Sequence, residues 1–355
     1  MNFTQTVLLW YCNNKRELPW RSVKDPYLIW VSEIIMQQTR VEQGREYFMR
    51  FKERFPTVIS LASAEEEDIL HLWQGLGYYT RARNMGIAAR DIVKHFEGVF
   101  PSGYNEILSL KGIGKYTASA IASIAFNLPF AVTDGNVIRF FARYFGITEP
   151  VDRNTGLRPI EKLAEKYLDP ENPGDYNQAI MEFGALQCKP GKPDCSQCPL
   201  SEGCFAFKYG LVDDLPVKSK RIKPRDRYFN YLVIINKESS QTPTILLKKR
   251  TDKDIWRNLY DFPMVETDAP VSIKKLTTLQ PFKEMTAGGD IIRIQAGEII
   301  MHQLTHQTIR ATFFIIDIEH HSNPQFVKVP FEHLHQYPIP KLIRNFIDGF
   351  LYPLK

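Results

Sequence analysis

Four of the five cysteines in this chain lie within seventeen residues, and they constrain its fold more than any other feature. Cys188, Cys195, Cys198 and Cys204 have the spacing C-x6-C-x2-C-x5-C. Thiolates placed so closely favour a metal centre, because soft sulfur ligands bind zinc and iron–sulfur clusters well. Intervals of six, two and five residues lack the paired CxxC motifs of a zinc ribbon. The spacing leaves a four-thiolate zinc site and an iron–sulfur cluster open, and makes a disulfide the weaker alternative.

Length and composition indicate a two-domain globular protein. The chain has 355 residues, of which 44% are hydrophobic and 24% charged, so it can bury a substantial core. No apolar run approaches the roughly 20 residues of a membrane span. The N-terminus lacks the basic and small-residue features of a signal peptide, so we expect a cytoplasmic protein without a membrane partner. The net charge of +5 permits a polyanionic partner without requiring one.

Hydrophobic periodicity divides the chain into a helical part and a mixed part. Helical patterns cover 30–51, 81–96, 116–126 and 135–146. Residues 63–66 match a capping box for a helix that ends before Gly75, and isolated Cys12 is expected to be a small buried side chain. After residue 227, short runs rich in β-branched residues predict strands, and 331–351 predicts a loop followed by a helix. We expect a mainly α domain at 1–212, a basic linker at 213–227 and an α/β domain at 228–355.

The segment 217–227 is strongly basic. It sets one acid, Asp226, against six bases: Lys218, Lys220, Arg221, Lys223, Arg225 and Arg227. Such a charge run is usually a solvated tether. A tether that also contacts phosphate groups is the alternative.

Gly112 and Gly114 lie between two helical stretches. Two glycines at alternate positions permit a tight turn whose backbone N–H groups face outward. These groups would lie at the N-terminus of a helix that begins near Lys115, where free donors bind phosphate. Asp134, twenty residues beyond Gly114, opens a further helix, and taken alone it could be only the N-cap.

Together these segments resemble the helix-hairpin-helix DNA glycosylase superfamily. The resemblance rests on LKGIGKYTA at 110–118, on TDGNVIRFFAR at 133–143 and on the four-cysteine motif, which in that superfamily holds a [4Fe–4S] cluster. Three further segments narrow it to the adenine DNA glycosylases, the MutY group. They are LPWR at 18–21, DPYLIWVSEIIMQQTRVEQ at 25–43 and WQGLGYYTRARNM at 73–85. The resemblance covers residues 15–205 and continues more weakly through the C-terminal part.

The resemblance implies a fold and an activity. It implies a monofunctional hydrolase of base excision repair that removes adenine mispaired with 8-oxoguanine or guanine in double-stranded DNA. The enzyme would act as a monomer in a bacterial cytoplasm. Its fold would be a helix-hairpin-helix domain with a [4Fe–4S] module at about 186–205, followed by a Nudix-like domain that recognises 8-oxoguanine. Gly112, Gly114 and Lys115 would contact the DNA backbone.

Two carboxylates carry the implied chemistry. Glu33 has apolar neighbours on a predicted helix, where Trp30 and Gln37 share its face, and burial there would raise its pKa. A protonated carboxyl assists the departure of adenine, because a purine leaves more easily once N7 is protonated. In the family, the residue matching Glu33 is this acid and also the base for the incoming water. Asp134 matches the carboxylate that stabilises the oxocarbenium-like sugar.

Tyr116 and Asn136 complete the implied catalytic set. Tyr116 matches a hairpin tyrosine beside the site that can hydrogen-bond the aspartate. In the endonuclease III branch this position is a lysine, which attacks the sugar as an amine and permits strand cleavage. A tyrosine cannot form a Schiff base, so Tyr116 indicates a monofunctional glycosylase. Asn136 is expected to orient or cap near Asp134.

Five further residues match positions that contact the target mispair. Arg21 and Gln178 match contacts to the flipped adenine, although a plain helix-surface position is an equal alternative for Gln178. Gln37, Gln38 and Tyr78 match the wedge residues that fill the duplex around the lesion. For Tyr78, core packing is the alternative.

The C-terminal domain is expected to read the lesion. In relatives a Phe-Ser-His loop does so, and here the matching segment is Leu304-Thr305-His306, between two predicted strands. It keeps the hydroxyl and the histidine but lacks the aromatic ring, and ordinary strand-end polar residues are the alternative. Residues 228–355 lack the G-x5-E-x7-R-E-x2-E-E signature, so the domain cannot hold the magnesium of a Nudix hydrolase.

The sequence disfavours two other function classes. A pyrimidine lyase like endonuclease III is disfavoured by Tyr116 and by the additional C-terminal domain. A non-catalytic DNA-binding protein is disfavoured because both Glu33 and Asp134 are present.

Overall fold

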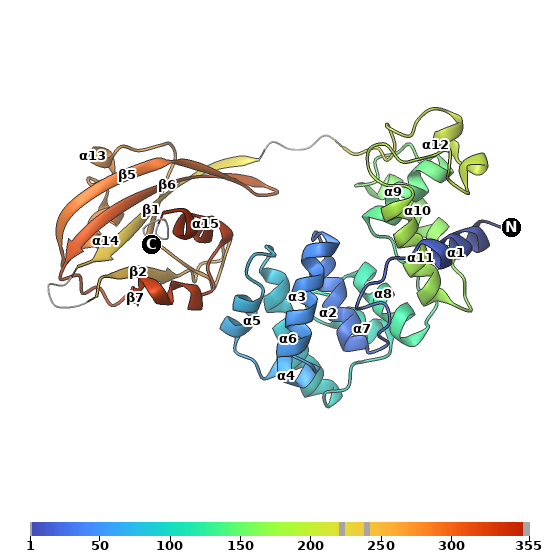
Figure 1. Ribbon diagram of the computed structural model, residues 1–355, viewed down its shortest axis with the longest axis horizontal. Coiled ribbons are helices and arrows are strands. Elements are labelled where there is room, and N and C mark those ends of the chain that lie inside the picture. The colour runs from blue at the N-terminus through green and yellow to red at the C-terminus, as the bar shows by residue number, and fades with distance from the viewer. Residues whose placement is uncertain (1, 220–223, 238–241, 351–355) are drawn as a thin grey trace. The chain divides into compact units, whose positions relative to one another are not determined.

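The computed structural model describes residues 2–219, 224–237 and 242–350 (Figure 1). The chain forms two compact units, one made of residues 1–64 and 83–221 and the other of residues 65–82 and 222–355. Three bases of the expected linker, Lys220, Arg221 and Lys223, lie outside the described residues. The first strand begins at Arg225, inside the segment expected to be linker.

The described part of the first unit is helical. Its helices are α1 (Phe3–Asn14), α2 (Pro26–Met36), α3 (Val41–Arg54), α4 (Val58–Ala62), α6 (Thr80–Phe96, which starts in the second unit), α7 (Tyr104–Ser109), α8 (Lys115–Phe126), α9 (Gly135–Phe145), α10 (Asn154–Tyr167), α11 (Pro173–Leu186), the short 3-10 helix η1 (Ser201–Gly203) and α12 (Phe205–Lys208). Buried aromatic side chains of α9 and α11, among them Phe140, Phe141 and Phe183, pack with Val7 of α1 into one core. This packing brings the N-terminal helix against the segment that leads to the cysteines.

The expected helix over 30–51 is two helices. Helix α2 ends at Met36 because Gln37 leaves the helical region with ψ 114° and Gln38 takes a left-handed φ of 59°. Gln37 therefore lies beyond the end of α2. The expectation that Gln37 shares a helical face with Glu33 is wrong.

Two smaller expectations are also wrong. The capping box does not form, since Ser63 follows α4 and Glu65 precedes α5 (Glu66–Leu72) without a side-chain cap. The Cys12 side chain is exposed rather than buried.

The turn between α7 and α8 requires its first glycine. Gly112 has φ 84°, and a Cβ there would lie 2.7 Å from the Asn84 Cβ atom. Helix α8 begins at Lys115 with Gly114 as its N-cap, as expected from the sequence. A Cβ added at Gly114 would meet no atom within 4 Å, so the N-terminus of α8 is open to a close approach by another molecule.

The second unit contains α5 and a mixed α/β region. Its described strands form one seven-stranded sheet in the order β3-β2-β1-β6-β5, with β4 paired to β1 and β7 paired to β2. The strands are β1 (Arg225–Asn236), β2 (Thr244–Lys249), β3 (Tyr260–Asp261), β4 (Met264–Thr267), β5 (Asp290–Gln303), β6 (Gln307–Glu319) and β7 (Val327–Pro330). The helices of this region are α13 (Ile273–Leu276), α14 (Gln280–Thr286), the 3-10 helix η2 (Phe331–Gln336) and α15 (Lys341–Phe350).

Helices cover both faces of this sheet. The α15 residues Leu342 and Ile343 pack against Tyr231 and Phe313 on one face. On the other face, Leu276 of α13 and Phe282 of α14 pack against alternate residues of β1 and β6. Strands β1 and β6 are parallel, which suits strands buried on both faces.

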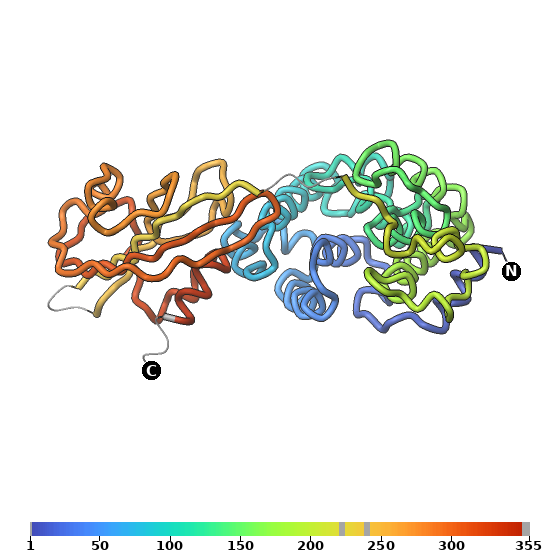
Figure 2. The backbone as a smooth tube through the Cα atoms, turned by 90° about the horizontal axis from the view of Figure 1, so that it is seen from above, coloured from blue at the N-terminus to red at the C-terminus, as the bar shows by residue number. Residues whose placement is uncertain are grey.

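Strands β5 and β6 form the long outer hairpin of the second unit (Figure 2). β5 lies at the end of the strand order, and two register shifts interrupt its pairing, near Ile292 and between Ala296 and Ile299. Bulges of this kind twist an open strand and hinder pairing with another chain. The hairpin turns at Leu304, Thr305 and His306, where the Leu304 N–H donates to the Gln307 carbonyl at 2.9 Å.

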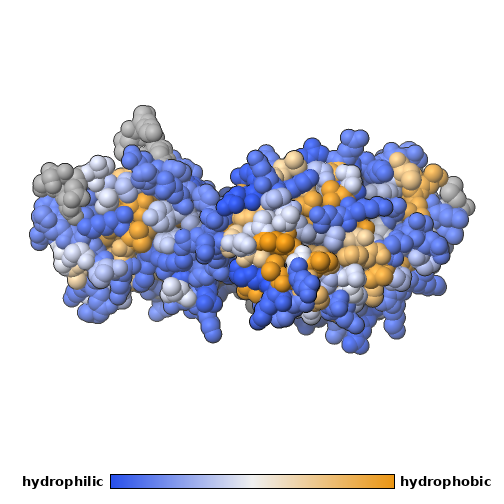
Figure 3. Space-filling view, turned by 90° about the horizontal axis from the view of Figure 1, so that it is seen from below, coloured by the Kyte–Doolittle hydropathy of each residue, from blue (hydrophilic) through white to orange (hydrophobic). Residues whose placement is uncertain are grey.

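One face of the molecule shows where apolar side chains gather on its surface. On the face drawn in Figure 3, apolar side chains gather into larger patches over the first unit than over the second. Within the described ranges, no helix combines the length and the apolar character needed to cross a lipid bilayer.

Candidate functional site

Glu33 and Tyr116 meet where α2 packs against α8. The Tyr116 hydroxyl donates to Glu33 Oε2 at 2.6 Å and lies 3.4 Å from Met181 Sδ. The resemblance implied a tyrosine that can hydrogen-bond Asp134, and the structure shows its hydroxyl bonded to Glu33. Tyr116 lies in the first turn of α8, and it is also close enough to Asp134 for the charge of that carboxylate to act on it.

The environment of Glu33 favours a protonated carboxyl. Burial raises the pKa of Glu33 from its usual 4.5 to about 7, the Tyr116 hydrogen bond opposes part of that rise, and the negative charge of Asp134 adds to it. Burial, together with the nearby charge of Glu33, raises the pKa of Tyr116 well above its usual value, so Tyr116 remains a hydroxyl donor. Near neutral pH, Glu33 therefore exists in both protonation states.

Asp134 is the N-cap of α9 and is held by its first turn. The carboxylate accepts from the backbone N–H groups of Asn136 at 2.9 Å and Val137 at 2.8 Å, and from Asn136 Nδ2 at 2.7 Å. Burial raises the pKa of Asp134, whereas these donors and the positive end of the helix favour its ionised form. Asn136 thus orients the carboxylate with both its backbone and its side chain.

Arg139 joins this cap to the segment before the first cysteine of the motif. Arg139 Nη2 donates to Asn136 Oδ1 at 3.0 Å and to the Gly184 carbonyl at 2.5 Å, while Nε donates to the Cys188 carbonyl at 2.9 Å. Arg139 did not stand out in the sequence. Its spacing of three residues from Asn136 on one helix was the signal that could have found it.

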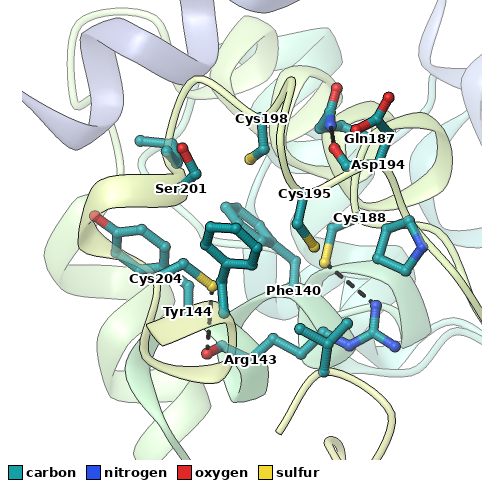
Figure 4. Close-up of a pocket in the computed structure, with 14 residues that line it drawn as sticks. Phe140, Arg143, Tyr144, Gln187, Cys188, Asp194, Cys195, Cys198, Ser201 and Cys204 are labelled. Atoms are coloured by element: carbon teal, nitrogen blue, oxygen red, sulfur yellow. Dashed lines mark hydrogen bonds between the residues drawn. The ribbon is translucent and has the colours of Figure 1, made fainter. Parts of the chain in front are cut away.

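The four clustered cysteines line one cavity together with Phe140, Arg143 and Tyr144 (Figure 4). All four are free thiols. Arg143 Nη1 donates to Cys188 Sγ at 3.6 Å, which brings a positive charge to the sulfur.

Two observations test whether this cavity fits a metal group. Burial raises the pKa of the Cys198 thiol to about 11, so a thiolate there needs a cationic partner, which a metal would supply. Among the described residues, no three His, Cys, Asp or Glu side chains converge on a point that would hold a single ion. Four thiols around one cavity are a donor set that suits a thiolate-bound metal group, either a zinc ion or an iron–sulfur cluster.

A second cavity opens beside Glu33. Its lining consists of Trp20, Arg21, Ile29, Ser32, Glu33, Ile124, Gln178 and Met181. Arg21 and Gln178, expected from the sequence to contact one substrate, thus share a cavity with the acid. Trp20 and Met181 also line it, and the sequence analysis did not name them.

Two of the three expected wedge residues have unusual backbone conformations. Gln38 and Tyr78 take left-handed φ values of 59° and 49°, which cost a residue other than glycine on the order of 1 kcal/mol. Gln37 Nε2 donates to Thr117 Oγ1 at 3.2 Å. The Tyr78 side chain is exposed, so the core-packing alternative is wrong.

The expected lesion-reading residues form the tip of the β5–β6 hairpin. Thr305 and His306 are exposed, whereas Leu304 is half-buried against the core of the sheet. Within the second unit, the Tyr78 hydroxyl and Thr305 Oγ1 lie 2.6 Å apart. Leu304, which replaces the aromatic ring of the Phe-Ser-His pattern, is therefore the residue that anchors the turn.

The chain resembles known proteins along its whole length. The profile of the "HhH-GPD superfamily base excision DNA repair protein" family matches residues 31–170, and that of the "NUDIX domain" matches residues 230–349. The adenine DNA glycosylase of Buchnera aphidicola subsp. Schizaphis graminum is 33% identical over 98% of both chains. Those of Arabidopsis thaliana and Homo sapiens are 40% and 29% identical, covering 73% and 92% of this chain and 46% and 69% of theirs.

Solved structures match the helical part. A thermostable thymine-DNA glycosylase aligns with a TM-score of 0.54 and 27% identity, over 58% of this chain and 95% of that one. A non-covalent endonuclease III–DNA complex aligns with a TM-score of 0.51 and 22% identity, over 59% and 94% of the two chains, which supports the fold alone. The expected order of a helical HhH-GPD domain and an α/β Nudix-like domain is confirmed.

Because the pKa of Glu33 is raised in the folded protein, the free energy of unfolding should depend on pH. The folded protein keeps a proton that the unfolded chain releases between pH 4.5 and about 7, so the free energy of unfolding falls as pH rises through this window. In the Glu33→Gln variant the side chain cannot ionise, so its free energy of unfolding does not show this fall. As pH rises from 4.5 to about 7, the free energy of unfolding of the variant should increase relative to that of the parent by at most about 3 kcal/mol. Denaturant unfolding at each pH measures this difference. Exposed Glu53→Gln is the control, and an offset for Glu33→Gln that does not change with pH would contradict the assignment.

Proposed function

Because the chain belongs to the adenine DNA glycosylases of the HhH-GPD superfamily, we propose that Glu33 and Asp134 divide the hydrolysis of adenine's N-glycosidic bond between them. The protein is an N-glycosyl hydrolase of base excision repair. The observation that carries the proposal is the contrast between the two carboxyls. Glu33 has a pKa near neutrality beside a tyrosine donor, whereas Asp134 accepts three hydrogen bonds at a helix N-terminus.

The first step breaks the bond between adenine and the sugar. Protonated Glu33 gives its proton to N7 of the flipped base, and the bonding electrons leave with adenine. The sugar becomes oxocarbenium-like, and the carboxylate of Asp134 stabilises this positive charge. The hydrogen bonds from Asn136 and Val137 hold the carboxylate in place while the charge develops.

The second step adds water. Glu33, now ionised, accepts a proton from a water molecule, whose hydroxide adds to the anomeric carbon. Tyr116 donates to Glu33 in both protonation states and offers no amine to the sugar, so the enzyme is a monofunctional glycosylase rather than a lyase. The cavity lined by Arg21 and Gln178 receives the base.

We propose that the substrate is duplex DNA with adenine opposite 8-oxoguanine or guanine. Gly112, Gly114 and Lys115 receive the backbone at the open N-terminus of α8. Gln37, Gln38 and Tyr78 fill the duplex around the mispair, and Thr305 with His306 reads the lesion from the hairpin tip. The enzyme acts as a monomer in a bacterial cytoplasm. We place the catalytic domain at 1–212 and the recognition domain at 228–355, to which the first three residues of β1, from Arg225, must be added.

We further propose that the four cysteines hold a [4Fe–4S] cluster in a module spanning about 186–205. Support comes from four free thiols around one cavity, with Arg143 beside Cys188. When bound, the cluster supplies covalent cross-links that order the loop from Cys198 to Cys204. Lys189 and Lys192 near this loop would then contribute phosphate contacts.

Removing either carboxyl should stop catalysis without preventing binding. Glu33→Gln keeps the shape of the side chain but cannot protonate N7, and Asp134→Asn cannot balance the sugar charge. Each should lower the single-turnover rate of adenine release by roughly 10²-fold or more, while gel-shift affinity for the duplex survives. Exposed Glu53→Gln is the matched control. If either variant releases adenine at a near-normal rate, the two-carboxylate mechanism is wrong.

Metal analysis tests the cluster. We expect about four iron and about four inorganic sulfide per chain, with visible absorbance that is lost on unfolding. If the protein contains about one zinc ion per chain and no sulfide, the cluster proposal is wrong and the cysteines form a structural zinc site.

The hairpin tip should set lesion preference. Thr305→Ala combined with His306→Ala should narrow the preference for adenine opposite 8-oxoguanine over adenine opposite guanine by roughly 1–3 kcal/mol, the value of a lost base-edge contact. Both side chains are exposed, and Thr305→Ala also removes the hydrogen bond to the Tyr78 hydroxyl, so the free energy of unfolding should fall by no more than about 1 kcal/mol. If the double variant discriminates the two duplexes as the parent does, the lesion is read elsewhere.

A further inference from the structure

A buried carboxylate joins two arginines next to the base cavity. Glu182 of α11 has a side chain that is 1% exposed, and it lies between Arg16 and Arg21. Oε1 accepts from the Arg16 backbone N–H at 2.9 Å, from Arg16 Nε at 2.9 Å and from Arg21 Nη1 at 2.8 Å. Oε2 accepts from Nη2 of each arginine at 2.6 Å. Neither Arg16 nor Glu182 stood out in the sequence.

These contacts exclude a direct chemical role for Glu182. Burial alone would raise the pKa of Glu182, but the hydrogen bonds from Arg16 and Arg21 outweigh burial and lower it to about 2. The carboxylate is therefore ionised at any working pH, and its two oxygens already accept five hydrogen bonds. It has neither a proton to give nor a free oxygen directed at a substrate.

The same contacts fix the orientation of Arg21. Its Nη1 donates both to Glu182 and to the Arg16 carbonyl at 2.9 Å, and its Nη2 donates once to Glu182. A guanidinium carries five N–H donors in a rigid plane, so the Nε–H and the second Nη2–H remain, and both lie on one edge. Arg21 also lines the cavity that holds Glu33 and Gln178. The Tyr11 ring, 5.5 Å from the guanidinium carbon, supports the plane from one side.

We propose that Glu182 is a positioning residue, which holds Arg21 so that its remaining donor edge faces the acceptor nitrogens of the flipped adenine. The inference rests on the proposed role of Arg21 as a base contact. Without Glu182, two neighbouring guanidiniums would repel each other, and Arg21 would be free to leave the cavity. Arg16 donates to both oxygens of the same carboxylate and so keeps it from rotating with Arg21.

A double-mutant cycle tests positioning against simple structural support. Glu182→Gln, Arg21→Ala and the double variant are compared in single-turnover excision on a duplex with adenine opposite 8-oxoguanine. We expect each single variant to lower the rate at least tenfold, and the double variant to match Arg21→Ala within about twofold, because Glu182 acts only through Arg21. Duplex affinity should change little. Multiplied effects in the double variant would overturn the inference.

Controls separate the possible failures. Melting temperature and iron content of each variant show whether it folds, and Glu53→Gln, an exposed change on α3, should retain the parent rate. If Arg21→Ala alone excises adenine normally, the base-contact role of Arg21 fails. If Arg21→Ala is slow but the cycle is additive, only the positioning role of Glu182 fails. Should Glu182→Gln not fold, Glu182→Asp carries the same cycle, since it keeps the charge but is too short to bridge both arginines.

Discussion

The burial of the Glu33 carboxyl between α2 and α8 is the constraint on which the site depends. A buried carboxyl requires a hydrogen-bond partner, and here the partner is the Tyr116 hydroxyl. Tyr116 can reach it only because α8 begins one residue earlier, at Lys115, which in turn requires the tight turn at Gly112. The turn at Gly112 thus places two consecutive residues of α8 in different surroundings. Lys115 faces solvent at the open N-terminus of the helix, whereas Tyr116 enters the site beside Glu33.

Helix α11 unites the parts of the site that the hairpin does not reach. Gln178, Met181 and Glu182 follow one another at helical spacing and meet the base cavity or the arginines beside it. Gly184 lets α11 approach the start of α9 closely, since a Cβ there would lie 2.6 Å from the Asn136 carbonyl oxygen. Two residues after α11 ends at Leu186, the first clustered cysteine appears. The base cavity and the Asp134 cap therefore share helix α11, and the lining of the cysteine cavity begins directly after it at Gln187.

The sequence predicted what depends on local pattern. The change from helical to strand periodicity, the start of α8 after Gly114 and the start of α9 after Asp134 all follow from residues close in the chain. Features decided by tertiary packing could not be predicted in this way. The break at Gln37 and Gln38 overrides a good helical pattern, and the partner of Tyr116 depends on which helix α8 packs against. Glu182 resembled a solvated helix residue, because its two arginines are more than 160 positions away.

The architecture of the hairpin tip has a consequence for natural variants. Thr305 and His306 are exposed, while Leu304 beneath them contributes to the core of the sheet. Chaperones and proteases remove proteins according to how often they unfold. A substitution at Leu304 would destabilise the fold, and the cell would degrade the variant. A substitution at Thr305 or His306 would leave the protein folded, so the variant would not be degraded. If the tip reads the lesion, such an enzyme would persist in the cell at full abundance, removing adenine from the wrong partner.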